Sequence, residues 1–137
     1  MLLAGKVAVI HGAGGAIGGA VARAFAREGA RVCLAGRTLA RLEAVAADIE
    51  AAGGAADGAE VDAHDAQAGD RHADAVAQKA GGIDIALNAI GVAHVQGTPF
   101  ADLSLQDYEY PIGVYTRSHF ITAQAGARHM AKKGSGG

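Results

Sequence analysis

The segment from residue 11 to residue 18 constrains the fold of this 137-residue chain more than any other feature. It reads HGAGGAIG and lies between an apolar run, Lys6–Ile10, and an apolar pattern with helical spacing that ends at Gly29. An apolar run without alternation is typical of a strand buried on both faces of a parallel sheet. A glycine-rich turn from such a strand into a helix predicts an α/β fold.

Strand and helix patterns alternate along the rest of the chain. The expected strands are 6–10, 31–35, 55–62 and 83–89, and the expected helices begin near residues 17 and 39 and span 66–80 and 104–130. The third strand contains Asp57, Gly58 and Glu60, which predicts an edge strand or a poorly formed one. The third helix is weakly apolar, because Gly69 and His72 occupy positions that would face a core.

The last expected helix carries its own start and stop signals. Ser104 and Asp107 resemble a capping box, and Pro111 is expected to kink or interrupt the early turns. The chain ends in GSGG, so residues 131–137 are expected to form a flexible tail. Since neither a linker nor an internal repeat is visible, residues 1–137 are interpreted as a single domain.

Alternating strands and helices with right-handed crossovers predict a doubly wound parallel sheet of about four strands in the order 3-2-1-4. The first and fourth strands then flank the switch point. Ligands of such sheets bind at the carboxyl ends of the strands beside this point. Those ends correspond here to the loops Gly12–Gly18 and Asn88–Gly91.

The glycine loop favours a dinucleotide. Amide groups at the start of a helix attract a pyrophosphate, and small residues allow the backbone to approach it. Gly12, Gly15 and Gly18 fit G-x-x-G-x-x-G, not the strict G-x-G-x-x-G. A merely structural turn, or a flavodoxin-like domain that binds no dinucleotide, remains the alternative.

The end of the second strand indicates NADP over NAD. An acid there would bind the adenosine 2′-hydroxyl of NAD, whereas an arginine would accommodate the 2′-phosphate of NADP. The sequence has Arg37 at this place and no Asp or Glu between Glu28 and Glu43. A guanidinium is therefore available to pair with the phosphate. The alternative is that Arg37 is an ordinary solvated surface residue.

Charge, cysteine and histidine content limit the classes of partner and the cellular location that are expected for this chain. Twelve Lys and Arg against fourteen Asp and Glu give a net charge of −2 without a basic block, so neither nucleic acid nor an anionic membrane is expected. The single cysteine, Cys33, and the absence of an apparent signal peptide favour the cytoplasm. The six histidines show no paired ligand spacing, so no metal site is expected.

With these residues assembled, the chain resembles the short-chain dehydrogenase/reductase family. Its glycine loop is similar to the family's T-G-x-x-x-G-x-G, with His11 for Thr and Ala16 for the middle Gly. Asp62-Ala63 resembles the acid after the third strand that contacts the adenine amino group. The sequence at 88–91, Asn-Ala-Ile-Gly, is similar to Asn-Asn-Ala-Gly. The resemblance implies a Rossmann-type domain that is truncated relative to the full family fold.

The same resemblance implies hydride transfer between a nicotinamide and a carbonyl or alcohol carbon of an unknown small-molecule substrate. The family's catalytic groups are a Ser and a Tyr-x-x-x-Lys. Tyr108, Tyr110 and Tyr115 are followed four positions later by Ile, Val and His, so no residue here is assigned a catalytic role. The chain is expected to be the nucleotide-binding half of an NADP-dependent oxidoreductase and inactive alone. The alternative is a non-catalytic dinucleotide-binding module or sensor.

Several residues are assigned to cofactor binding on these grounds. They are Gly12, Gly14, Gly15, Ala16, Ile17, Gly18, Arg37, Asp62, Ala63, Asn88, Ala89 and Gly91.

His11 could be a charged neighbour of the phosphate or a buried structural residue. Tyr115 is explained more simply by helix packing than by proton donation, and Cys33 by a small buried apolar role. The unprotected apolar edge of the fourth strand predicts self-association, and thus a homo-oligomer or aggregation.

Overall fold

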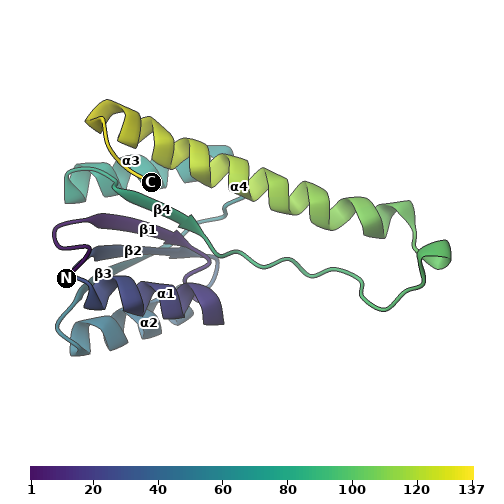
Figure 1. Ribbon diagram of the computed structural model, residues 1–137, viewed down its shortest axis with the longest axis horizontal. Coiled ribbons are helices and arrows are strands. Elements are labelled where there is room, and N and C mark those ends of the chain that lie inside the picture. Colours follow the sequence, from purple (N-terminus) through teal and green to yellow (C-terminus); the bar gives the residue numbers. More distant parts are fainter.

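The computed structural model describes residues 1–137 and shows a parallel sheet between two layers of helices (Figure 1). The strands are β1 (Val7–His11), β2 (Arg31–Gly36), β3 (Ala55–Glu60) and β4 (Ile85–Asn88). The helices are α1 (Ala16–Arg27), α2 (Leu39–Ala51), α3 (Ala66–Ala80) and α4 (Leu105–Lys133), with a 3-10 turn at Phe100–Asp102. The strand order is β3-β2-β1-β4, which confirms the predicted doubly wound topology.

Alternation along the strands divides the core between the two faces of the sheet. Ala8 and Ile10 of β1 pack with α1 and α2, whereas Val7 and Val9 pack with α3 and α4. Cys33 of β2 lies in the second of these clusters, where burial raises the pKa of its thiol. Both faces of the central strands are covered, which is why their sequences are continuously apolar.

The polar third strand is explained by its place at the sheet edge. β3 pairs in parallel with β2 alone. The carboxylate of Asp57 accepts hydrogen bonds from Arg31 and from Lys79, each at 2.7 Å. The acid in this strand is therefore paired with two cations, and the expected edge strand forms over six residues.

The glycines of the outer helices make close contacts possible. A Cβ on Gly69 of α3 would lie 3.1 Å from Cγ2 of Ile121 in α4. A Cβ on Gly126 of α4 would lie 2.8 Å from Cβ of Ala86 in β4. The small residue in the third helix therefore allows α3 and α4 to approach each other, instead of weakening their contact as its composition suggested.

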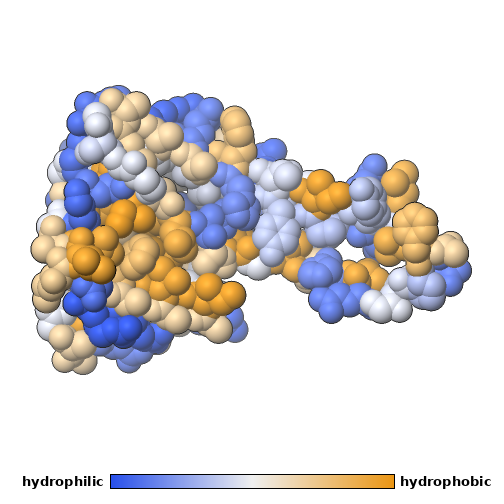
Figure 2. Space-filling view, in the orientation of Figure 1, coloured by the Kyte–Doolittle hydropathy of each residue, from blue (hydrophilic) through white to orange (hydrophobic).

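The helix α4 is docked on the sheet along only part of its length. Its buried residues begin at Ser118, and its first half projects beyond the sheet together with the preceding segment (Figure 1). Apolar side chains are exposed on this projection (Figure 2), among them Phe100 and Leu105. None of the helices combines the length and the apolar character needed to cross a membrane.

The start of α4 confirms the predicted cap. The backbone N–H of Asp107 donates to the hydroxyl of Ser104 at 3.1 Å, and that hydroxyl donates to the Asp107 carboxylate at 2.8 Å. Of the kink or interruption expected at Pro111, the interruption does not occur, because the helix continues through this residue. Pro111 leaves the carbonyl of Asp107 without its helical donor, but this turn is exposed and water can satisfy the carbonyl.

The end of the chain is held by the sheet where a flexible tail was expected. Residues 131–133 belong to α4, and Gly134 ends the helix in the left-handed conformation with φ +78°. The N–H of Gly137 donates to Asp84 at 2.9 Å, and its carbonyl accepts from Ala86 at 3.0 Å. Part of the β4 edge that was expected to drive self-association is therefore paired within the chain.

A buried carboxylate joins the start of β4 to β1 and α4. The side chain of Asp84 accepts from the Val7 N–H at 2.8 Å and from Lys133 Nζ at 2.6 Å, and Lys6 Nζ lies 3.9 Å away. Burial by itself would raise the pKa of Asp84. The bonds from Lys133 and Val7, with the charges of both lysines, hold it below its usual range.

We predict that Asp84→Asn lowers the free energy of unfolding at pH 7 by about 1–3 kcal/mol, because a charged acceptor is lost from a buried network. A depressed folded pKa means that the contribution of Asp84 is complete above its unfolded pKa, about 3.9, and is lost as the pH falls through the folded pKa. Urea unfolding at pH 7 and pH 3 measures this. A difference between variant and wild type that is equally large at both pH values would contradict the prediction.

Candidate functional site

A cleft of about 240 Å³ opens at the carboxyl ends of the strands. It is lined by Gly12, Gly14, Gly15, Arg37, Thr38, Arg41, Leu42, Val61, Asp62, Ala63, His64, Ala89, Ile90 and Gly91. These residues follow all four strands, although the strands are far apart in the sequence. We call this site the carboxyl-end cleft. Its position beside β1 and β4 is the predicted switch point.

Most of the predicted site residues meet in the carboxyl-end cleft. Those that line it are Gly12, Gly14, Gly15, Arg37, Asp62, Ala63, Ala89 and Gly91. Ala16, Ile17, Gly18 and Asn88 are not among the lining residues. The first three form the first turn of α1, and the fourth turns its side chain toward α4.

Gly12 allows the loop after β1 to touch the loop after β4. Its φ is +76°, and a Cβ there would lie 2.7 Å from the backbone carbon of Ala89. A Cβ on Gly18 would overlap the carbonyl oxygen of Gly12. Only glycine fits at these two positions, because each would place a side chain inside neighbouring backbone.

The first turn of α1 presents unpaired backbone donors. Gly15 precedes the helix without a capping side chain, and its N–H donates to the Gly12 carbonyl at 3.1 Å. The first bond of the helix runs from Gly19 to Gly15 at 2.9 Å. The amides of residues 16–18 therefore have no acceptor within the chain. Three free N–H groups at the positive end of a helix dipole are suited to an anion such as a phosphate.

The wall formed by the start of α2 is basic. Arg37, Thr38 and Arg41 all line the carboxyl-end cleft, and Asp62 is the only acid among its lining residues. The sequence reading missed Arg41, although it lies four residues after Arg37 and at the start of a helix. A Cβ on Gly14 would lie 3.0 Å from Cβ of Arg41, so the glycine loop allows this turn of α2 to come close.

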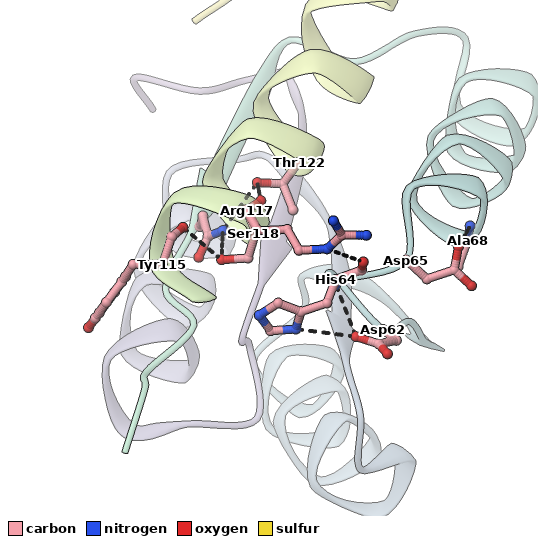
Figure 3. Close-up of polar contacts among 9 residues, drawn as sticks. Asp62, His64, Asp65, Ala68, Tyr115, Arg117, Ser118 and Thr122 are labelled. Carbon is pink, nitrogen blue, oxygen red and sulfur yellow. Dashed lines mark hydrogen bonds and ion pairs between the residues drawn. The ribbon is translucent and has the colours of Figure 1, made fainter. Parts of the chain in front are cut away.

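Asp62 is held at the cleft by the turn that follows β3 (Figure 3). The His64 N–H donates to Asp62 Oδ1 at 2.9 Å, and His64 Nδ1 lies 3.4 Å from the same oxygen. The hydrogen bond from the His64 backbone is the largest cause of the lowered pKa of Asp62. Asp65 then caps α3 through the N–H groups of residues 67 and 68. The carboxylate is thus ionised at neutral pH and is presented by a fixed turn.

The side chain of Asn88 connects the other wall of the cleft to α4. Its Nδ2 donates to Thr122 Oγ1 at 3.1 Å and to Ser118 Oγ at 3.5 Å. Its Oδ1 accepts from the Ile90 N–H at 2.9 Å. Asn88 therefore shapes the 89–91 wall from behind, and in this structure its side chain does not line the cleft.

His11 takes a buried structural position, whereas Tyr115 is exposed on α4 and the packing role expected for it is not seen. His11 is 5% exposed, and its ring meets that of His72 edge-on with centroids 5.9 Å apart. Burial, followed by the charge of His72, lowers the pKa of His11 to about 4. The imidazole is neutral at pH 7, which favours the structural interpretation over a charged neighbour of the phosphate. Tyr115 lies on α4 outside the cleft lining, with its ring tilted against that of His119.

The sheet order, the glycine-only contact and the free amides at the switch point define a doubly wound domain of the dinucleotide-binding type. A comparison with protein families then identifies it further. The chain belongs to the short-chain dehydrogenase family, whose model matches residues 6–137.

Among curated proteins, the chain is similar to the D-threitol dehydrogenase of Mycolicibacterium smegmatis, with 38% identity over 98% of the chain and 51% of the relative. It is also similar to the L-rhamnose 1-dehydrogenase (NAD(P)(+)) of Azotobacter vinelandii, with 34% identity over all of the chain and 54% of that protein. The chain thus spans about half the length of these curated relatives.

Solved structures share the fold. A metagenomic short-chain oxidoreductase in complex with NADP superposes with a TM-score of 0.86 at 32% identity, over 99% of this chain and 61% of the other. A short-chain type dehydrogenase/reductase from Mycobacterium marinum gives 0.88 at 36% identity, over 98% of this chain and 54% of the other.

We predict that Gly12→Ala destabilises the chain by about 2 to 4 kcal/mol, because the new Cβ meets backbone and the left-handed conformation is strained. Gly113→Ala is the matched control, since a Cβ at this helical glycine has nothing within 4 Å. The control should be neutral or up to about 1 kcal/mol more stable. Denaturant unfolding compares the two, and equal effects would contradict the assigned backbone contact.

We also predict that His11 stays neutral down to about pH 5. The folded pKa lies below the unfolded value of 6.5, so its contribution to stability is complete above pH 6.5 and is lost progressively as the pH falls toward 4. A pH titration of the imidazole resonances by NMR measures this directly. A midpoint near 6.5 for His11 would show that the ring is not buried as described.

Proposed function

We propose that this chain is the nucleotide-binding part of an NADP-dependent oxidoreductase. The observation that carries the choice of NADP is the basic wall of the carboxyl-end cleft, where Arg37 and Arg41 stand without an acid on the same wall. Guanidinium groups pair well with phosphate, and a carboxylate that would repel the 2′-phosphate is absent from the wall. The NADP complex of a similar structure supports the same choice.

The cleft and the first turn of α1 beside it fit the parts of this cofactor. The free amides of the first turn of α1 would hold the pyrophosphate, since they lack acceptors within the chain. The carboxylate of Asp62 would accept a hydrogen bond from the adenine amino group. The small residues Ala89 and Gly91 leave space along the β4 wall. When bound, the nicotinamide supplies the hydride donor or acceptor for a carbonyl or alcohol carbon.

The proposed substrate class is based on the names of the similar curated proteins. Two of them are named for D-threitol and L-rhamnose, which supports a polyhydroxylated substrate for the whole enzyme.

None of the three tyrosines of this chain lies in the carboxyl-end cleft, and none is followed by a lysine four residues later. We propose that the chain binds the cofactor in the cytoplasm but is inactive alone. The exposed apolar side chains along α4 support a homo-oligomer.

We predict that the chain binds NADPH more tightly than NADH by roughly 10- to 100-fold, the range expected when a phosphate gains charged hydrogen bonds. Arg37→Gln should remove most of this preference and leave the affinity for NADH nearly unchanged. Arg41→Gln should have a smaller effect in the same direction. Isothermal titration calorimetry with both cofactors measures the preference.

Arg27→Gln is the matched control, because it removes the same charge from the last turn of α1 at the opposite end of the sheet. It should leave the ratio of the two affinities unchanged. Equal binding of the two cofactors by the wild type, or tighter binding of NADH, would overturn the choice of NADP.

A further inference from the structure

The side chain of Arg117 reaches from α4 to the turn that carries Asp62 (Figure 3). Its Nε donates to the backbone carbonyl of His64 at 2.9 Å, across 53 positions of sequence. The N–H and the ring of the same His64 hold the carboxylate of Asp62 in the carboxyl-end cleft. Two contacts in series therefore connect α4 to a lining residue of the cleft.

The turn itself depends on few interactions. The N–H of Asp65 donates to the Asp62 carbonyl at 3.1 Å, and Asp65 caps α3. These bonds determine the shape of the turn, but they all lie within it and within the start of α3. The Arg117 bond adds a side-chain contact from α4, a distant element of the chain, and fixes the orientation of the turn. A charged donor on a carbonyl is among the stronger hydrogen bonds of proteins.

Other contacts anchor α4 elsewhere. Arg128 donates to Asp70 at 2.8 Å, His129 lies 2.9 Å from Asp74, and Lys133 bonds the buried Asp84. The partners of these three lie in α3 or at the start of β4, and none of them lines the cleft. Arg117 is therefore not needed simply to attach the helix, and its contact with the Asp62 turn requires another explanation.

We propose that Arg117 is a positioning residue for nucleotide binding: it holds the His64 carbonyl so that Asp62 is presented to the adenine side of the cofactor. This inference rests on the proposed function of the carboxyl-end cleft. Since Arg117 precedes Ser118, the first buried residue of α4, it lies where the docked half of the helix meets the projecting half. By linkage, nucleotide binding strengthens the docking of α4 at this point as much as docking strengthens binding.

The test uses Arg117→Met in the full 137-residue chain, because methionine keeps an unbranched apolar stem and removes the donors. The probes are NADPH, NADH and adenosine 2′,5′-bisphosphate, titrated by calorimetry. We expect all three affinities to fall by roughly 5- to 20-fold, less than the full value of a charge-assisted hydrogen bond, because the lost bond orients the Asp62 turn and does not touch the nucleotide. The ratio of NADPH to NADH affinity stays unchanged, because Arg37 still faces the 2′-phosphate.

Two further variants separate positioning from stability. Arg128→Met removes a guanidinium from the same helix away from the cleft, so it lowers the unfolding midpoint without changing any affinity. Arg117→Lys retains a donor that can reach the His64 carbonyl and restores most of the lost affinity. Equal losses of affinity in the Arg117→Met and Arg128→Met variants, or no rescue by lysine, overturn the positioning role.

The outcome for the wild type distinguishes this inference from the function on which it rests. Failure of the unmodified chain to bind any of the three probes overturns the proposed function, and the inference with it. Normal binding by the wild type together with unchanged binding by Arg117→Met overturns the positioning role alone. Hydrogen exchange measures the linkage between nucleotide binding and the docking of α4. We expect NADPH to slow the exchange of residues 113–122 in the wild type but not in Arg117→Met.

Discussion

The backbone contact between Gly12 and the loop after β4 is the constraint on which the rest of the structure depends. A Cβ on residue 12 would lie only 2.7 Å from the Ala89 backbone. The ends of β1 and β4 can therefore be neighbours only because residue 12 has no side chain. Their adjacency creates the switch point, and the first turn of α1 begins beside it, directly after the glycine loop. The amides of that turn are free because they begin a helix that has no capping side chain, and the close approach of the two loops places them beside the cleft.

Local patterns were sufficient to predict the order of the sheet and to name several residues that the fold brings together in one cleft. The unalternating apolar runs, the glycine loop and Arg37 each act over a few residues, so a sequence shows them directly. The edge position of β3 was also visible, because Asp57 could not stand in a central strand without a partner. What made these predictions reliable is that short-range chemistry and the overall topology agree.

Several features that sequence reading missed depend on contacts between distant segments or on exposure to solvent. Gly69 suggested a weak helix, but the side chain of Ile121 fills the space that the glycine leaves. Pro111 suggested a break, but its turn is exposed and the missing bond has little cost there. The pairing of Gly137 with β4 also joins segments that no local pattern connects. In each case the partner lies in a distant segment or in solvent, about which sequence periodicity carries no information.

The cleft is consequently a product of both helical layers, although its glycine loop belongs to one. The glycine loop and the basic start of α2 are supported by α1 and α2, whereas the Asp62 turn and the 89–91 wall are held from the α4 side through Arg117 and Asn88. Arg117 carries a formal charge on a largely exposed helix, so hydrophobic patterning alone would class it as a solvated surface residue. Its partner is a backbone carbonyl, which every residue possesses and no sequence motif marks. Polar links of this kind connect a half-docked helix to the walls of a cleft that it does not line.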